Sequence, residues 1–170
     1  MVQTDVKQIK KARAGKYLTF KLGDENYGLE IQKVIEIIGM QDITPVPRTP
    51  DHLKGVINLR GIIHPVIDLN KKFGLGMTKE TDLTCIIVVS IERDDEKEQM
   101  GIIVDAVSEV EEIKAAEIEN TPSLGNQINT DFILGMAKTK DTVKMLLDLQ
   151  KVLSDRDLDM ISKVNNNKNN

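Results

Sequence analysis

Side chains able to do acid, base or nucleophilic chemistry are sparse in this sequence. Its histidines are His52 and His64, and its only cysteine is Cys85. His64 lies in an apolar run, where a structural histidine is favoured over a catalytic one. A small hydrolase would need His64 to converge with Asp68 or Asp105 in a cleft, and the sequence leaves that alternative open. His52 follows a predicted turn and has no neighbour at metal-ligand spacing.

Other candidate motifs also favour structural roles. Cys85 precedes the apolar run 86–89, so we expect a buried small side chain without an internal disulfide. The glycines at 74–76 lack the third glycine of a dinucleotide loop, and no Gly-rich loop ends in Lys-Ser or Lys-Thr. The acidic runs 92–98 and 109–112 are typical of a hairpin turn and an exposed strand face. We therefore predict that the protein is not an enzyme and binds no metal or cofactor.

Composition limits the partners. The 170 residues are long enough for one compact domain or two small fused ones. The net charge of −4 comes from 23 basic and 27 acidic residues spread along the chain, which lacks the basic stripe that nucleic acid requires. Residues 1–7 have no apolar core of signal-peptide length, and no apolar run reaches the length of a membrane span. We predict a cytoplasmic protein that binds no nucleic acid and does not insert into the membrane.

The elements that position any site are mainly strands. Segments such as 17–22 and 82–92 are short, rich in β-branched residues and bounded by Gly, Asp and Asn. The proline-rich segment 44–50 is predicted to be an extended surface connector. Apolar spacing over 148–164 predicts one C-terminal helix. Within it, a serine at 154 followed by Asp157 resembles a helix N-terminal cap, where the helix either starts or breaks.

The chain contains a weak internal repeat. Three residues recur 73 positions later in the same order: Gly28, Val34 and Glu36 as Gly101, Val107 and Glu109. Residues 59–61 are echoed by 133–135 at an offset of 74, and residues 68–71 by 148–151 at an offset of 80. The growing offset indicates a loop insertion in the second copy. The pattern predicts two duplicated small barrels with a groove between them, and chance similarity between β segments is the alternative.

The stretch from residue 55 to 69 is the most distinctive one, reading Gly-Val-Ile-Asn-Leu-Arg-Gly-Ile-Ile-His-Pro-Val-Ile-Asp-Leu. Its single arginine, Arg60, lies among apolar strand residues, where it either extends to the surface or presents its guanidinium group to a partner. Local sequence alone favours a surface or salt-bridged arginine. Asp68 ends the strand and is predicted to cap the short helical turn that follows.

Residues 55–69 resemble the most characteristic stretch of the CheW family of bacterial chemotaxis proteins. Residues 20–31 and 34–37 resemble the opening of that family and residues 101–110 its second half, so the resemblance covers residues 16 to 155. It implies a mainly β fold of two intertwined SH3-like five-stranded barrels with a C-terminal helix. It also reverses the local interpretation of the arginine at 60, which becomes a predicted partner contact.

The resemblance also implies a division of the chain. Residues 1–14 are expected to be a flexible segment and residues 15–155 a CheW-like domain. Its two barrels are expected at about 22–82 and 83–147. Residues 156–170 are expected to hold the end of the helix and a disordered Asn-rich tail.

The function implied by the resemblance is that of an adaptor. Such proteins couple methyl-accepting chemoreceptors to the histidine kinase CheA, which gives receptors control of kinase activity and assembles signalling arrays at the inner face of the cytoplasmic membrane. The implied partners are the regulatory domain of CheA and the cytoplasmic tip of the receptors, with the protein monomeric when isolated. Alternatives are a CheV-like variant or a CheW-like domain of CheA, although these residues contain no receiver domain or kinase core.

Receptor contact in this family maps to the groove between the barrels. The positions it implies here are Val34, Glu36, Thr44, Gly55, Arg60, Gly101, Val107, Val110 and Gly135. Because the receptor tip is a helical hairpin, we expect Val34 and Val107 to supply apolar contact and Arg60 and Glu36 to fix the register. The residues that contact the kinase are not assigned.

Overall fold

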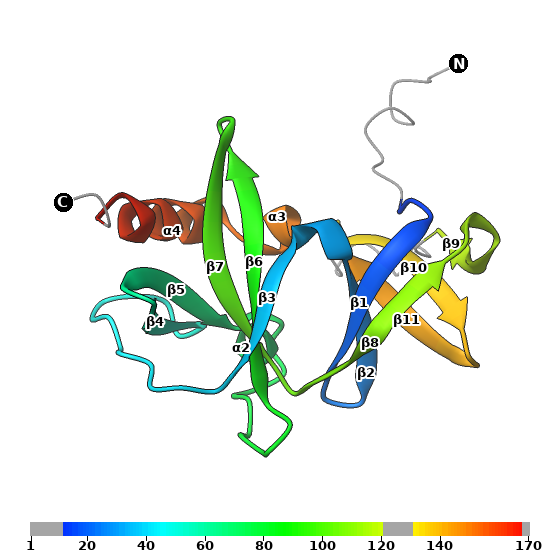
Figure 1. Ribbon diagram of the computed structural model, residues 1–170, viewed down its shortest axis with the longest axis horizontal. Coiled ribbons are helices and arrows are strands. Elements are labelled where there is room, and N and C mark those ends of the chain that lie inside the picture. The colour runs from blue at the N-terminus through cyan, green and yellow to red at the C-terminus, as the bar shows by residue number, and fades with distance from the viewer. Residues whose placement is uncertain (1–11, 121–130, 168–170) are drawn as a thin grey trace.

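The computed structural model describes residues 12–120 and 131–167 of the chain. Two β-sheets lie side by side, and a C-terminal helix packs beside one of them (Figure 1). The predictions for residues 1–11 and for residues 168–170 fall outside the described part. A mainly β fold of two five-stranded barrels with a C-terminal helix was predicted. The structure confirms the mainly β class and the C-terminal helix, with two sheets of six and five strands.

The chain starts in the six-stranded sheet, forms the whole five-stranded sheet and then returns to the six-stranded one. The six-stranded sheet has the order β8-β1-β2-β11-β10-β9 and contains β1 (Gly15–Leu22), β2 (Glu25–Glu30), β8 (Ala106–Ile113), β9 (Ile118–Glu119), β10 (Ile133–Thr139) and β11 (Thr142–Leu147). The five-stranded sheet has the order β3-β6-β7-β5-β4 and contains β3 (Val34–Gly39), β4 (Leu53–Leu59), β5 (Ile62–Asp68), β6 (Cys85–Arg93) and β7 (Glu96–Val104). Short helices η1 (Ile31–Lys33), α2 (Leu69–Lys72), η2 (Ala115–Glu117) and α3 (Leu149–Val152) connect them, and α4 (Asp155–Asn167) closes the described chain.

The two copies of the repeat exchange their first hairpins. The hairpin of β1 and β2 joins the sheet formed by β8 to β11, whereas the hairpin of β6 and β7 joins β3, β4 and β5. Each exchanged hairpin forms one parallel pair, β2 with β11 and β7 with β5, and one antiparallel pair, β1 with β8 and β6 with β3. The division into sheets therefore does not follow the predicted barrel boundaries at 22–82 and 83–147. The predicted intertwining came from the resemblance, because a partner strand across the exchange leaves no local signal in the sequence.

The strand registers define which residues of the copies are equivalent. Gly55 lies opposite Val66 after a register shift in the β4–β5 pair, and Gly135 lies opposite Leu146 after the same shift in the β10–β11 pair. Gly55 and Gly135 are thus equivalent at an offset of 80. The predicted echo of residues 59–61 in 133–135 is wrong, because those segments lie at opposite ends of their strands. The insertion precedes β10, in the connection that also contains β9.

Buried apolar side chains join both sheets into one core. The largest cluster includes Phe20 from the six-stranded sheet, Ile87 and Ile102 from the five-stranded sheet, and Leu149 and Ile161 from the C-terminal helices. Alternating burial along strands such as β4 produces this arrangement, since successive side chains point to opposite faces. The sheets therefore hold each other in a fixed relation, which positions the surface between them.

Two predicted helix caps are confirmed. The Asp68 carboxylate accepts a hydrogen bond from the backbone N–H of Lys71, and it begins α2. Ser154 and Asp157 each accept a hydrogen bond from the other's backbone N–H, at 3.1 and 3.0 Å, so the predicted C-terminal helix is broken there into α3 and α4. Helix α4 runs through Asn167, so residues 165–167 of the Asn-rich tail that was predicted to be disordered lie in the helix.

Candidate interaction surface

Arg60 and Glu36 form an exposed ion pair at one corner of the five-stranded sheet. Arg60 lies in the tight turn between β4 and β5 with a φ of 54°, and the Gly61 N–H donates to the Asn58 side chain at 2.8 Å. One guanidinium nitrogen of Arg60 donates to both carboxylate oxygens of Glu36, at 3.0 and 2.8 Å. The Arg60 side chain is 73% exposed, so the remainder of its guanidinium group can still bind a partner.

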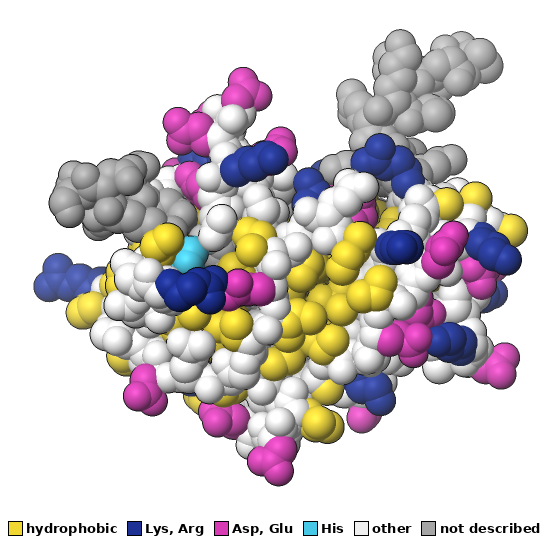
Figure 2. Space-filling view, in the orientation of Figure 1, with side chains coloured by type: hydrophobic (Ala, Val, Ile, Leu, Met, Phe, Trp, Pro, Cys, Tyr) yellow, Lys and Arg dark blue, Asp and Glu magenta, His cyan; other side chains and the backbone are white. Residues whose placement is uncertain are grey.

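Exposed apolar side chains lie on β3, before and after Glu36 in the sequence, and on β8. Ile35 and Ile37 on β3 are 44% and 45% exposed, and Val110 on β8 is 49% exposed. β3 and β8 are the end strands of the two sheets. Figure 2 shows apolar side chains gathered across the middle of this face, where the two sheets meet. An exposed apolar strip beside a fixed charged pair is suited to binding another protein.

The remaining predicted receptor contacts lie beneath or behind this surface. Val34 and Val107 are partly buried against the main core. Thr44 pairs with Val56 through two backbone hydrogen bonds of 2.9 Å and lies directly over Gly55. The structure therefore places these four predicted residues where they support the strands, with Thr44 exposed at their edge.

The three glycines predicted as contacts are buried, and a side chain would clash at Gly55 and Gly101 and fit tightly at Gly135. A Cβ atom at Gly55 would lie 2.1 Å from the Thr44 carbonyl oxygen, and the φ of Gly55 is +148°. A Cβ at Gly101 would lie 2.7 Å from the Ile86 side chain, and one at Gly135 would lie 3.1 Å from a backbone oxygen. These glycines would affect partner binding indirectly, by allowing the close packing that sets the positions of the strands.

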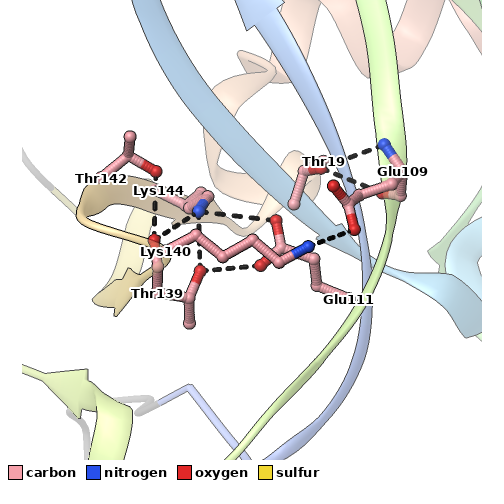
Figure 3. Close-up of polar contacts among 7 residues, drawn as sticks. All are labelled: Thr19, Glu109, Glu111, Thr139, Lys140, Thr142 and Lys144. Atoms are coloured by element: carbon pink, nitrogen blue, oxygen red, sulfur yellow. Dashed lines mark hydrogen bonds and ion pairs between the residues drawn. The ribbon is translucent and has the colours of Figure 1, made fainter.

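The six-stranded sheet has a matching corner that the sequence did not reveal. Lys140 lies in the turn between β10 and β11 with a φ of 52°, and its ammonium group pairs with Glu109 at 2.5 Å (Figure 3). Lys140 follows Arg60 by 80 positions and Glu109 follows Glu36 by 73, which are the offsets of the equivalent strands. The repeat contained this signal, but the change from arginine to lysine concealed it.

A buried polar cluster lies behind the second corner. Lys144 and Glu111 have side chains only 5% and 7% exposed, with 3.5 Å between the ammonium and carboxylate groups. The Thr139 hydroxyl donates to Glu111 at 2.7 Å and accepts from Lys144 at 2.7 Å, while Lys144 also donates to the Thr139 carbonyl (Figure 3). The charges are therefore compensated inside the sheet, which gives the cluster a structural role.

The carboxylates considered for hydrolysis are engaged in holding loops. Asp68 accepts hydrogen bonds from the N–H and hydroxyl of Thr78, at 3.0 and 2.6 Å. Asp105 accepts from the Gly23 N–H and from the Asn70 amide, at 2.6 and 2.9 Å. These contacts give both groups a structural role. Within residues 12–120 and 131–167, no cluster of His, Cys, Asp and Glu has the makings of a metal site.

Cys85 lies half-buried at the start of β6. Burial raises the pKa of its thiol, and a hydrogen bond from the Val107 backbone partly opposes this shift. The thiol is therefore a poor nucleophile at neutral pH.

Among the helices of the described residues, none is long and apolar enough to span a bilayer.

Comparison with known proteins identifies the family and the fold. Residues 16–157 match the CheW-like domain. The chain belongs to the CheW family. It is 35% identical over 148 residues to a chemotaxis protein CheW of Klebsiella aerogenes, with 87% of each chain covered. It is also 35% identical to a chemotaxis protein CheW of Bacillus subtilis, covering 81% of this chain and 86% of that protein.

A solved CheW structure has the same architecture. The crystal structure of the scaffolding protein TtCheW from Thermoanaerobacter tengcongensis is 41% identical and has a TM-score of 0.72, covering 82% of this chain and 92% of that one. The predicted family and the predicted fold class are confirmed by these matches. The role supported for this chain is that of a chemotaxis scaffold, the kind of protein that works by binding others.

Proposed function

We propose that this protein couples chemoreceptors to the histidine kinase CheA, with the corner formed by Arg60 and Glu36 as part of the receptor site. The observation that carries the proposal is the exposed ion pair beside the apolar strip of Ile35, Ile37 and Val110. A helical receptor tip would lay its apolar face on this strip and its charged side chains against the guanidinium and carboxylate groups. The regulatory domain of CheA is proposed to bind a different surface, so one molecule joins both partners.

The predicted contacts divide into two roles under this proposal. Arg60, Glu36 and Val110 would touch the receptor directly, because their side chains reach solvent. Thr44, Val34 and Val107 would shape the groove. Gly55, Gly101 and Gly135 would act through packing, so their substitution would disturb binding and folding together.

A pull-down with purified partners tests the proposal. Wild type and Arg60→Ala are mixed separately with the regulatory domain of CheA and with a receptor cytoplasmic fragment. We expect wild type to retain both partners and Arg60→Ala to lose receptor binding by about tenfold while retaining the kinase domain. Binding of wild type to neither partner would overturn the coupling role.

The second corner supplies a matched control. Lys140→Ala removes an exposed cation from the same kind of turn and breaks the equivalent ion pair. We expect it to retain receptor binding at the wild-type level. An equal loss for both variants would mean that net charge, and not the Arg60 corner, drives the interaction.

Two further properties follow from the proposed role. The protein is proposed to be cytoplasmic, recruited to receptor arrays at the inner face of the membrane, and monomeric when isolated. A fluorescent fusion should gather in receptor clusters and disperse in cells that lack receptors. Sedimentation of the isolated protein should give the mass of one chain, 19.0 kDa.

A further inference from the structure

A hollow separate from the Arg60 corner lies between α2, α3 and strands β2 and β11 of the six-stranded sheet. It has a volume of about 350 Å³, within the range of sites that bind small ligands or single side chains. Its wall is formed by Tyr27, Phe73, Leu75, Phe132, Met145 and Val152, together with Lys72 and Lys151. None of these residues belongs to the proposed receptor site.

Aromatic rings line this hollow in an unbroken series. The chain has five aromatic residues, and four of them form consecutive ring contacts. Tyr27 and Phe73 have ring centroids 5.8 Å apart, and Phe73 and Phe132 stack at 5.2 Å. Phe73 and Phe132 remain partly exposed, so their faces are available to a planar or bulky apolar group.

A tyrosine hydroxyl in the wall has no hydrogen-bond partner among the described residues. The residue is Tyr27, which is only 6% exposed. Burial, with a smaller contribution from the charge of Glu25, raises the pKa of Tyr27, so the group is a protonated donor at neutral pH. The hydroxyl is not among the buried polar atoms that lack a partner, so it reaches solvent, where a ligand with an acceptor can bind it.

The charged groups of the wall are all basic. Lys72 donates to Asp157 at 2.7 Å, which neutralises it, whereas Lys151 is exposed and forms no ion pair with a described residue. No acidic residue lines the hollow, although the chain as a whole has a net charge of −4. The site therefore favours an anionic group next to the apolar one.

We propose that this hollow binds an acidic peptide segment of a partner protein through one large apolar or aromatic side chain. The side chain would enter between Phe73, Phe132 and Met145, a neighbouring carboxylate would pair with Lys151, and a peptide oxygen would accept from Tyr27. The binding is independent of the proposed coupling function, because it uses no residue of the Arg60 corner.

Fluorescence of a probe peptide tests this proposal directly. The protein contains no tryptophan, so an acetylated and amidated peptide Gly-Glu-Trp-Glu-Gly carries the only indole in the mixture. We expect its emission to shift to the blue as full-length protein is added. The same peptide with glutamine in place of both glutamates should bind about tenfold more weakly at low salt. Absence of a shift with the acidic peptide overturns the proposal.

Two substitutions assign the binding to this hollow. Tyr27→Phe keeps the ring and removes the hydroxyl, so we expect unchanged folding and about fivefold weaker binding. Lys151→Glu should abolish the preference for the acidic peptide, whereas Lys54→Glu, at an exposed lysine on β4, should leave it unchanged. Binding insensitive to both Tyr27→Phe and Lys151→Glu would place the peptide elsewhere and refute the site.

Two controls establish what occupies the hollow and whether receptor binding depends on it. If free N-acetyltryptophan bound as tightly as the peptide, the ligand would be a small molecule and the peptide proposal would be wrong. Tyr27→Phe and Lys151→Glu should retain the receptor fragment in a pull-down. Loss of peptide binding with intact receptor binding thus tells this proposal apart from the proposed function.

Discussion

The two sheets present similar corners over different interiors. Arg60 with Glu36 and Lys140 with Glu109 occupy equivalent places in the repeat, and each cation lies in a left-handed turn. The residues behind them differ in kind: Ile38, Leu59 and His64 in the five-stranded sheet correspond to Glu111, Thr139 and Lys144 in the six-stranded sheet. The same exposed ion pair is therefore found above two kinds of interior, one mainly apolar and the other a cluster of paired charges. The corners also differ chemically, since arginine binds a carboxylate with two donors in a plane and lysine acts as a point charge.

The largest expected effect comes from breaking the charged interior. Lys144→Met should lower the free energy of unfolding by about 3 to 5 kcal/mol, because Glu111 would remain buried without its cation. The variant Lys144→His, Glu111→Ile, Thr139→Leu copies the other interior and should recover most of that loss. Urea unfolding measures both. A triple variant no more stable than Lys144→Met would show that the two interiors are not interchangeable.

Equivalent glycines should differ in their tolerance of a methyl group. Gly55→Ala should cost about 3 kcal/mol, because its Cβ would meet a backbone oxygen at 2.1 Å and its φ is strained for alanine. At Gly135 the nearest atoms lie at 3.1 Å and the backbone is unstrained, so Gly135→Ala should cost about 1 kcal/mol or less. Thermal unfolding monitored by circular dichroism checks the order. Equal costs would mean that the close approach at Gly55 relaxes.

The C-terminal helix α4 packs on β5 and β7 of the five-stranded sheet, and its buried carboxylate, Asp157, pairs with His52 and Lys72. Burial alone would raise the pKa of Asp157, but hydrogen bonds from Lys72, the Ser154 N–H and His52 outweigh it and lower the pKa to about 2. Because the folded pKa lies below the unfolded value, this stabilisation is present above about pH 4 and is lost as the pH falls toward 2. Asp157→Asn should cost about 2 kcal/mol at pH 7.

The control for this contact lies in the repeat itself. Phe132 occupies in the other copy the place of His52, since each accepts a backbone hydrogen bond of 2.8 Å from the aspartate that begins the next helix. His52→Phe should therefore keep the fold and weaken the attachment of α4. Hydrogen exchange of α4 amides at pH 7 measures the attachment. Exchange in Asp157→Asn as slow as in wild type would contradict the role of the cluster.

The smallest expected effect on stability is at the exposed corners. Arg60→Ala and Lys140→Ala should both leave the midpoint of urea unfolding unchanged, because exposed ion pairs contribute little to stability. The difference between them should be seen only in receptor binding. A clear loss of stability for Arg60→Ala alone would assign this arginine to the fold.

Local sequence predicted the strands, the two helix caps and the surface arginine, because alternation, capping residues and turns are encoded over a few positions. The offset of 73 also identified Glu109 as the counterpart of Glu36. The family resemblance implied intertwined barrels, but local sequence could not show the exchange of hairpins, since it depends on pairs such as Val66 with Gly101 that are far apart in the chain. The contact of His52 with Asp157 joins residues 105 positions apart for the same reason.

Because the hairpins are exchanged, the connection between α2 and β6 links two halves of the chain that depend on each other to fold. Residues 15–72 carry strands of both sheets, as do residues 85–152, so neither half can complete a sheet by itself. If the chain were cut in this connection, the halves would have to find each other as complementing fragments. In the intact chain, the connection keeps the two halves at a high effective concentration. Their association therefore does not depend on the protein concentration, as the association of two separate fragments into an intertwined dimer would.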